Sequence, residues 1–150
     1  MFIYSVKFVC GTQNVPATGG PSPCTSVRPG VYSTEINIHN FNKTDAKIEK
    51  RLLWLVQNDD ATKGREPESQ AAKLLVQNFK LKSDWATMDD CCNLDRLNSA
   101  QTAFDPGKIN IGFLEILSPS ELSVTAVYTA TDKNGASISI DVETFSAHTV

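Results

Sequence analysis

The sequence predicts an all-β chain, a two-sheet antiparallel β-sandwich of the jelly-roll or immunoglobulin-like kind. Three observations predict it. Apolar and polar residues alternate along most of the chain, as they do in strands with one buried face. Turn-forming residues separate these stretches. The chain has 150 residues, 41% of them hydrophobic, which suits a single domain over residues 1–150 with its own core. About eight strands and one short helix near residues 90–100 are expected.

The first three strands are expected at residues 2–10, 31–40 and 45–57. In the third, Lys50 interrupts an otherwise apolar face. Leu52 and Leu53 also fit a helix there, but the turn before the segment and the loop after it favour a strand. Proline and glycine recur through residues 11–30, which predicts a long loop. A loop of this length is either a contact site or a surface excursion.

The rest of the chain is expected to add short strands and one helix. A polar loop at residues 58–69 precedes strands at 71–76 and 85–88. Leucine spacing between residues 89 and 101 predicts one or two helical turns, capped by Asp89 or Asp90. Strands follow at 109–117, 122–130 and 138–142. The run Asp132-Lys133-Asn134-Gly135 predicts a hairpin turn, because Asn-Gly accepts positive φ.

Four cysteines are present, at positions 10, 24, 91 and 92, without the spacing of a zinc site. We expect free thiols that are buried or inert. Disulfides are the alternative if the protein meets an oxidising environment, including bonds between subunits. Cys10 and Cys24, which flank the long loop, are a candidate pair.

Known active-site motifs are absent from the sequence. We therefore predict a protein that is not an enzyme and has no cofactor and no metal. His39 with a cysteine could form a base and nucleophile, but a hydrogen-bonded histidine at a strand end is the simpler interpretation. Asp89, Asp90 and Asp95 could gather a cation, although helix capping explains them more simply.

Both tryptophans, Trp54 and Trp85, are expected to anchor the core, with a sugar-binding platform as the alternative.

The net charge of −3 argues against nucleic acid as a partner. The longest apolar runs fall short of the roughly 18 residues of a membrane span, so no membrane partner is expected. The N-terminal residues alternate, unlike a signal peptide. Synthesis in the cytoplasm without a signal peptide is expected, with the cell or spore surface as a candidate final site.

Two predicted strands lack the charges that protect a sheet edge. Residues 2–10 carry only Lys7 and residues 109–117 only Glu115 as charged residues, so a second sheet, loops or another subunit must cover them. The same pattern equally fits strands buried in the centre of a sheet. The edge placement favours a self-assembling structural protein that is not an enzyme. It would be the subunit of a homo-oligomer, with a fibre or a tube as one form of the assembly. The alternative is a small-ligand-binding or signalling module with a site near residues 11–30. The candidate assembly contacts are Phe2, Tyr4, Val6, Phe8, Cys10, Cys24, Cys91 and Cys92.

Several segments resemble a family of small uncharacterised bacterial β-sandwich proteins. They are VKFVCG at 6–11, RPGVYSTEINIHN at 28–40, GFLEI at 112–116, LSVTAVYTA at 122–130 and SIDVE at 139–143. More distantly, the layout is similar to sensory-rhodopsin-transducer-type sandwiches, which implies small homo-oligomers. It is also similar to the jelly-roll subunits of endospore appendage fibres. Those subunits lock their neighbours through cysteines on an N-terminal arm, whereas this chain starts directly at a predicted strand.

Overall fold

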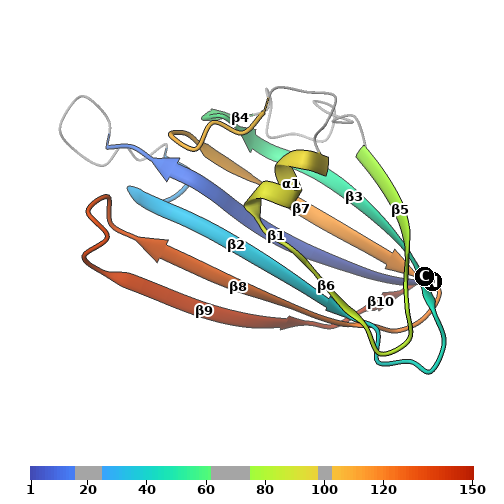
Figure 1. Cartoon of the computed structure of the whole chain (residues 1–150). Coiled ribbons are helices and arrows are strands. Elements are labelled where there is room, and N and C mark those ends of the chain that lie inside the picture. The colour runs from blue at the N-terminus through green and yellow to red at the C-terminus, as the bar shows by residue number, and fades with distance from the viewer. Residues whose placement is uncertain (16–24, 62–74, 98–102) are drawn as a thin grey trace.

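The computed structural model describes residues 1–15, 25–61, 75–97 and 103–150, and this part of the chain forms ten strands and one helix (Figure 1). The prediction of an all-β chain with one short helix is confirmed. In chain order the elements are β1 (Phe2–Gln13), β2 (Gly30–His39), β3 (Ala46–Gln57), β4 (Asp60–Ala61), β5 (Leu75–Leu81), β6 (Ala86–Asp89), α1 (Cys91–Leu97), β7 (Ile109–Ser118), β8 (Ser123–Thr131), β9 (Ile138–Phe145) and β10 (His148–Thr149).

Hydrogen bonding joins all ten strands into one antiparallel sheet, so two separate sheets are not confirmed. The main order is β4-β3-β7-β1-β2-β8-β9, with β5 beside β3, β6 beside β2 and β10 beside β1. β1 and β2 pair only where Gly11, Thr12 and Gln13 meet the start of β2. Beyond that point β2 continues with β6, and β1 pairs with β10 near its other end. The two halves of the sheet therefore separate, and α1, β5 and β6 lie in front of β1 and β7 (Figure 1).

The core fills the space between these halves. Alternate residues of β1, β2, β3, β7 and β8 point into it, as the period-two pattern predicts. Tyr4 is 1% exposed, and its hydroxyl both donates to the Leu122 carbonyl (2.8 Å) and accepts from the Leu122 amide (2.7 Å). These bonds satisfy a buried polar group and hold the connection between β7 and β8 against β1. The fully buried large side chains are Tyr4, Val6, Phe8, Ile36, Ile38, Ile48, Leu52, Leu94, Ile109, Leu114, Ile116 and Val124.

Of the two placements that the sequence left open for these strands, the structure shows the central one, and the interpretation as poorly protected edges is wrong. β1 pairs with β7 from Phe2 to Gly11, and β7 pairs with β3 on its other side. Apolar residues on both faces suit strands that are covered from both sides. Four of the proposed assembly contacts are therefore buried within the chain itself, namely Tyr4, Val6, Phe8 and Cys10.

The tryptophans have different environments. Trp54 is 6% exposed and packs edge-on against Phe8, with ring centroids 5.5 Å apart, so its predicted core role is confirmed. Trp85 is 57% exposed, with the Lys82 ammonium 4.8 Å from its ring centroid. The prediction that Trp85 anchors the core is wrong, because it lies in the exposed turn between β5 and β6 rather than on an inward strand face.

The structure also moves some predicted boundaries. β1 extends to Gln13 and β2 begins at Gly30, so the predicted loop is shorter at both ends, and residues 16–24 lie outside the described part. In place of the strand predicted at 71–76, the structure has β5 at Leu75–Leu81. Residues 71–74 lie outside the described part of the chain. The predicted hairpin turn is confirmed: Gly135 has φ 69° and donates its amide to the Asp132 carbonyl (3.1 Å).

Candidate functional site

β9 forms one edge of the sheet, and one of its two exposed faces is apolar. Within the described residues β9 pairs with β8 alone. Ile138, Ile140 and Val142 are 67%, 65% and 63% exposed. They lie opposite residues of β8 whose side chains point away from the core. Monomeric proteins avoid a row of exposed β-branched side chains on an edge strand, because it pairs with other chains.

The backbone at this edge is also available for pairing. The Val142 amide donates to its neighbour's carboxylate, Asp141 Oδ1, at 3.0 Å, which indicates that it does not point toward β8. Backbone groups point to alternate sides along a strand. The N–H and C=O groups of Ile138, Ile140 and Val142 therefore face the open edge. The residues with the exposed apolar side chains are the ones whose backbone groups face the open edge.

The other face of β9 carries negative charge. Asp141 lies opposite Tyr128 of β8, and Tyr128 donates its hydroxyl to the Lys7 carbonyl (2.8 Å). Burial, together with the charges of Glu143 and Asp141, raises the pKa of Tyr128 to about 12. The two faces of β9 thus differ, with apolar side chains on one and carboxylates on the other.

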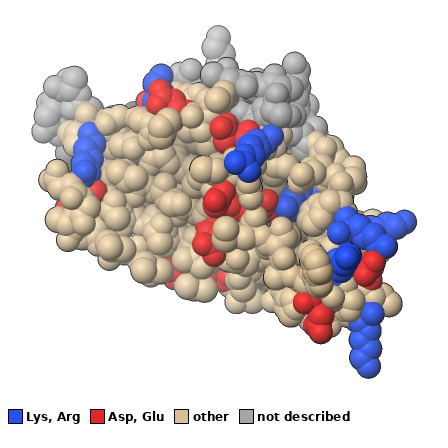
Figure 2. Space-filling model, viewed as in Figure 1, with Lys and Arg blue, Asp and Glu red and all other residues tan. Residues whose placement is uncertain are grey.

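Few charged side chains surround the apolar face of β9. Figure 2, drawn from the same side as Figure 1, shows a broad uncharged area over β2, β8 and β9 at lower left, while lysines and arginines gather at the opposite end. Val31 on β2 adds a further apolar side chain, 39% exposed, and lies across β8 from Ile138 through Thr131. An uncharged surface of this kind is typical of a contact with another protein.

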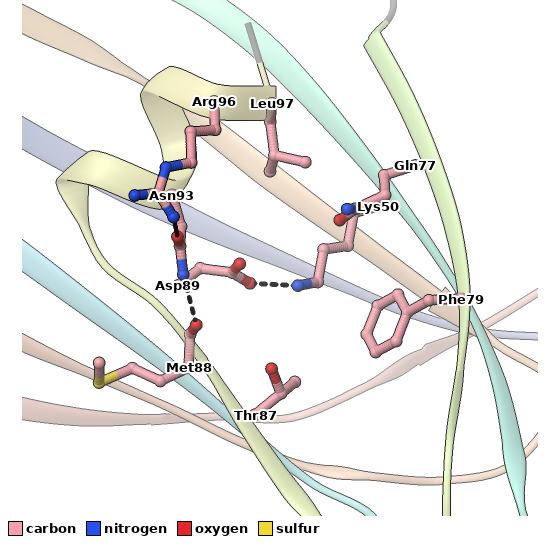
Figure 3. Close-up of a pocket in the computed structure, with 9 residues that line it drawn as sticks. All are labelled: Lys50, Gln77, Phe79, Thr87, Met88, Asp89, Asn93, Arg96 and Leu97. Atoms are coloured by element: carbon pink, nitrogen blue, oxygen red, sulfur yellow. Dashed lines mark hydrogen bonds and ion pairs between the residues drawn. The ribbon is translucent and has the colours of Figure 1, made fainter. Parts of the chain in front are cut away.

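A second candidate site is a cavity of about 430 Å³ between β5 and β6, under α1, with both polar and apolar side chains in its wall (Figure 3). Lys50 rises into it from β3 and pairs with Asp89 of β6, with Nζ and Oδ2 2.6 Å apart. Both side chains are buried, at 4% and 6% exposure. The Lys50 ammonium also lies 4.6 Å from the ring centroid of Phe79 on β5. The residue that interrupts the apolar pattern of β3 thus forms a buried ion pair.

This pair connects the two halves of the folded sheet, since β3 belongs to one and β6 to the other. The helix above is attached through Asn93, which donates to the Met88 carbonyl (3.1 Å) and accepts from Arg96 (3.3 Å) (Figure 3). The cavity wall therefore carries two cations and one carboxylate, together with the apolar side chains of Phe79, Met88 and Leu97.

The cysteines differ from the expectation. Cys10 of β1 forms a disulfide with Cys91, the first residue of α1, and Cys92 is free and exposed. The prediction of free thiols is therefore wrong for Cys10 and Cys91, and Cys24 is not the partner of Cys10. Cys24 itself lies outside the described part. Because the bonded cysteines have a sequence separation of 81, no local spacing could reveal the pair.

The other polar candidates have structural contacts. His39 is exposed, and its Nε2 lies 4.0 Å from Asp84 Oδ1. Asp90 caps α1 by accepting from the Asn93 amide (2.8 Å), so the predicted capping is confirmed. Asp95 accepts from the Phe104 amide (2.8 Å). Across residues 1–15, 25–61, 75–97 and 103–150, no group of three or more potential ligands could hold a metal ion.

The described chain has no helix long and apolar enough to cross a membrane. No protein-family model matches the chain, and no curated protein matches it. Among solved structures, the chain is similar to one described as the crystal structure of Thermotoga maritima 1070. The similarity covers 93% of this chain and 91% of the other, at 12% sequence identity and a TM-score of 0.48.

Proposed function

We propose that this protein is a non-enzymatic structural subunit that associates with copies of itself through the edge of β9. The observation that carries the proposal is the row of exposed apolar residues, Ile138, Ile140 and Val142, on a strand whose outer side pairs with no other strand among the described residues. Strand addition uses these two properties together, since backbone hydrogen bonds hold the strands and side chains set the register. The contact surface is thus β9 instead of β1.

The strength of such a contact follows from its parts. A backbone hydrogen bond contributes about 0.5–1.5 kcal/mol net, and an apolar cross-strand pair about 0.2–1 kcal/mol. Association itself costs about 4–15 kcal/mol. For one short strand, the gain and the cost are of similar size, so we expect weak association that depends strongly on protein concentration.

The test is the mass of the protein in solution across a concentration series, by sedimentation velocity or light scattering. The wild type should shift from monomer to oligomer as concentration rises. Ile140→Lys places a charge in the row and should keep the protein monomeric. Val76→Lys is the matched control, because Val76 is a 47% exposed strand residue of β5. A wild type that stays monomeric at the highest concentration would refute the proposal.

A second candidate function is binding of a small molecule in the cavity at Lys50 and Asp89. The specific observation is a charged pair, almost completely buried, at the wall of an open cavity. Cations and a carboxylate side by side suit a small zwitterion such as a free amino acid. A thermal-shift screen with the twenty amino acids tests this, with Arg96→Gln as the site variant and the exposed Arg28→Gln as its control. No shift with any of them would exclude this class of ligand.

A further inference from the structure

The sequence of β9 limits how two copies of the strand can pair. A sheet that continues from one copy to the next through antiparallel edges has a two-fold axis perpendicular to it. Opposite residues must then come from the same face of β9, so Ile138, Ile140 and Val142 pair among themselves. Ser139, Asp141 and Glu143 also pair among themselves. Only a few registers satisfy this condition, and they differ in which charges they place opposite each other.

Charge separates these registers. With the axis between Ile140 and Val142, Asp141 lies opposite its own copy, and with the axis at Val142, Asp141 lies opposite Glu143. Like charges directly opposite each other destabilise a strand pair. With the axis at Ile140, Asp141 lies opposite Ser139 and Glu143 opposite Ser137. Shifting the axis to Ser139 also avoids paired acids, but it shortens the overlap of the two strands.

The backbone groups that face the open edge are compatible with the register centred on Ile140. The residues whose N–H and C=O face the open edge, Ile138, Ile140 and Val142, are then the hydrogen-bonded pairs: Ile140 with its own copy and Ile138 with Val142 of the second copy. The Val142 amide exchanges its bond to Asp141 Oδ1 for one to a backbone carbonyl. The three apolar side chains of each copy meet on the uncharged face.

We propose that two copies of this protein form a closed dimer by pairing their β9 strands antiparallel about Ile140. This inference rests on the proposed self-association and specifies its geometry. Because the contact is isologous, each copy uses its only β9 edge and none is left for a third. The contact along β9 therefore closes at two copies and does not by itself extend into a fibre or tube.

Engineered cysteines can determine the register. In the proposed pairing, Ser139 and Asp141 of opposite copies form a non-hydrogen-bonded pair, whose Cα atoms lie about 4.5 Å apart, within the range of a disulfide. Three variants are compared by mild oxidation and non-reducing electrophoresis: Ser139→Cys, Asp141→Cys and the double variant. All carry Cys24→Ser and Cys92→Ser, so that cysteines other than Cys10 and Cys91 do not contribute to the linkage.

The double variant should form several-fold more disulfide-linked dimer than either single variant, and peptide mapping should find the bond between positions 139 and 141. Efficient linkage of Asp141→Cys alone would place the axis at Asp141 and overturn the proposed register. Efficient linkage of Ser139→Cys alone would place the axis at Ser139, in the register with the shorter overlap, and would also overturn it. A third outcome is that no cysteine variant forms a linked dimer, while the wild type still associates and Ile140→Lys still prevents that association. Self-association through β9 would then stand, and pairing of the strand edges would be refuted. In that case the uncharged faces pack against each other instead. A monomeric wild type refutes both proposals.

Discussion

Removal of the disulfide between Cys10 and Cys91 should lower the stability of the protein substantially. The bond closes a loop with a sequence separation of 81. The chain-entropy relation for a loop of that size gives about 4.5 kcal/mol at 25 °C. We expect the double variant Cys10→Ala/Cys91→Ala to lose most of this, because alanine keeps the buried strand position of Cys10 apolar.

The assay is urea denaturation followed by fluorescence of the buried Trp54. For a slope of about 2 kcal/mol per molar urea, the loss corresponds to a shift of about 2 M in the midpoint. The wild type in a thiol-free phosphine reductant should shift similarly. Cys92→Ser is the matched control, since this neighbouring thiol is free and exposed, and it should change stability by less than about 0.5 kcal/mol. A loss below about 1 kcal/mol in the double variant would refute the loop-closure reasoning.

Three further predictions concern the core and its polar contacts. Asp89→Asn leaves the Lys50 ammonium buried without its partner and should lower the free energy of unfolding by about 3–5 kcal/mol. Lys50→Met combined with Asp89→Leu should recover most of this loss in urea denaturation. A double variant as unstable as Asp89→Asn would contradict the prediction. The raised pKa of Tyr128, about 12, means that the unfolded chain loses this proton first, so the free energy of unfolding should fall as pH rises from about 10 to 12. Tyr128→Phe should remove that part of the pH dependence, and an unchanged pH profile would argue against the assignment. Gly112→Ala would place a methyl group 2.2 Å from the Leu53 carbonyl oxygen and should cost at least about 1–3 kcal/mol in thermal or urea unfolding, whereas unchanged stability would show that β3 and β7 can separate locally.

The sequence predicted most strands because burial in this chain follows the period-two pattern closely. In β3, every second residue from Ala46 to Val56 is buried, as the alternation requires. The helix and the Asn-Gly turn were also predictable, since leucine spacing, an aspartate cap and a positive-φ glycine are local signals. Pattern alone could not say whether β1 and β7 lie at an edge or inside a sheet, because both positions suit a strand with two apolar faces.

The candidate sites depend on contacts between distant segments, which a single sequence does not reveal. Lys50 was visible as an interruption of the apolar face, but its partner Asp89 reads as a helix cap from sequence. Cys10 and Cys91 meet only because α1 packs over β1. The exposed row on β9 alternates like any half-buried strand, and only its place at the end of the sheet leaves it uncovered.

The central place of β1 has a consequence for how the protein is made. β1 ends at Gln13, whereas its main partner β7 begins at Ile109. At synthesis rates of about 5–20 residues per second, the first strand waits on the order of 5–20 s for its partner. During that interval β1 has open backbone groups and two apolar faces, which is the state that neighbouring nascent chains pair with most readily. In the finished protein β1 is paired with β7 along most of its length, whereas on the ribosome it is the strand that needs protection.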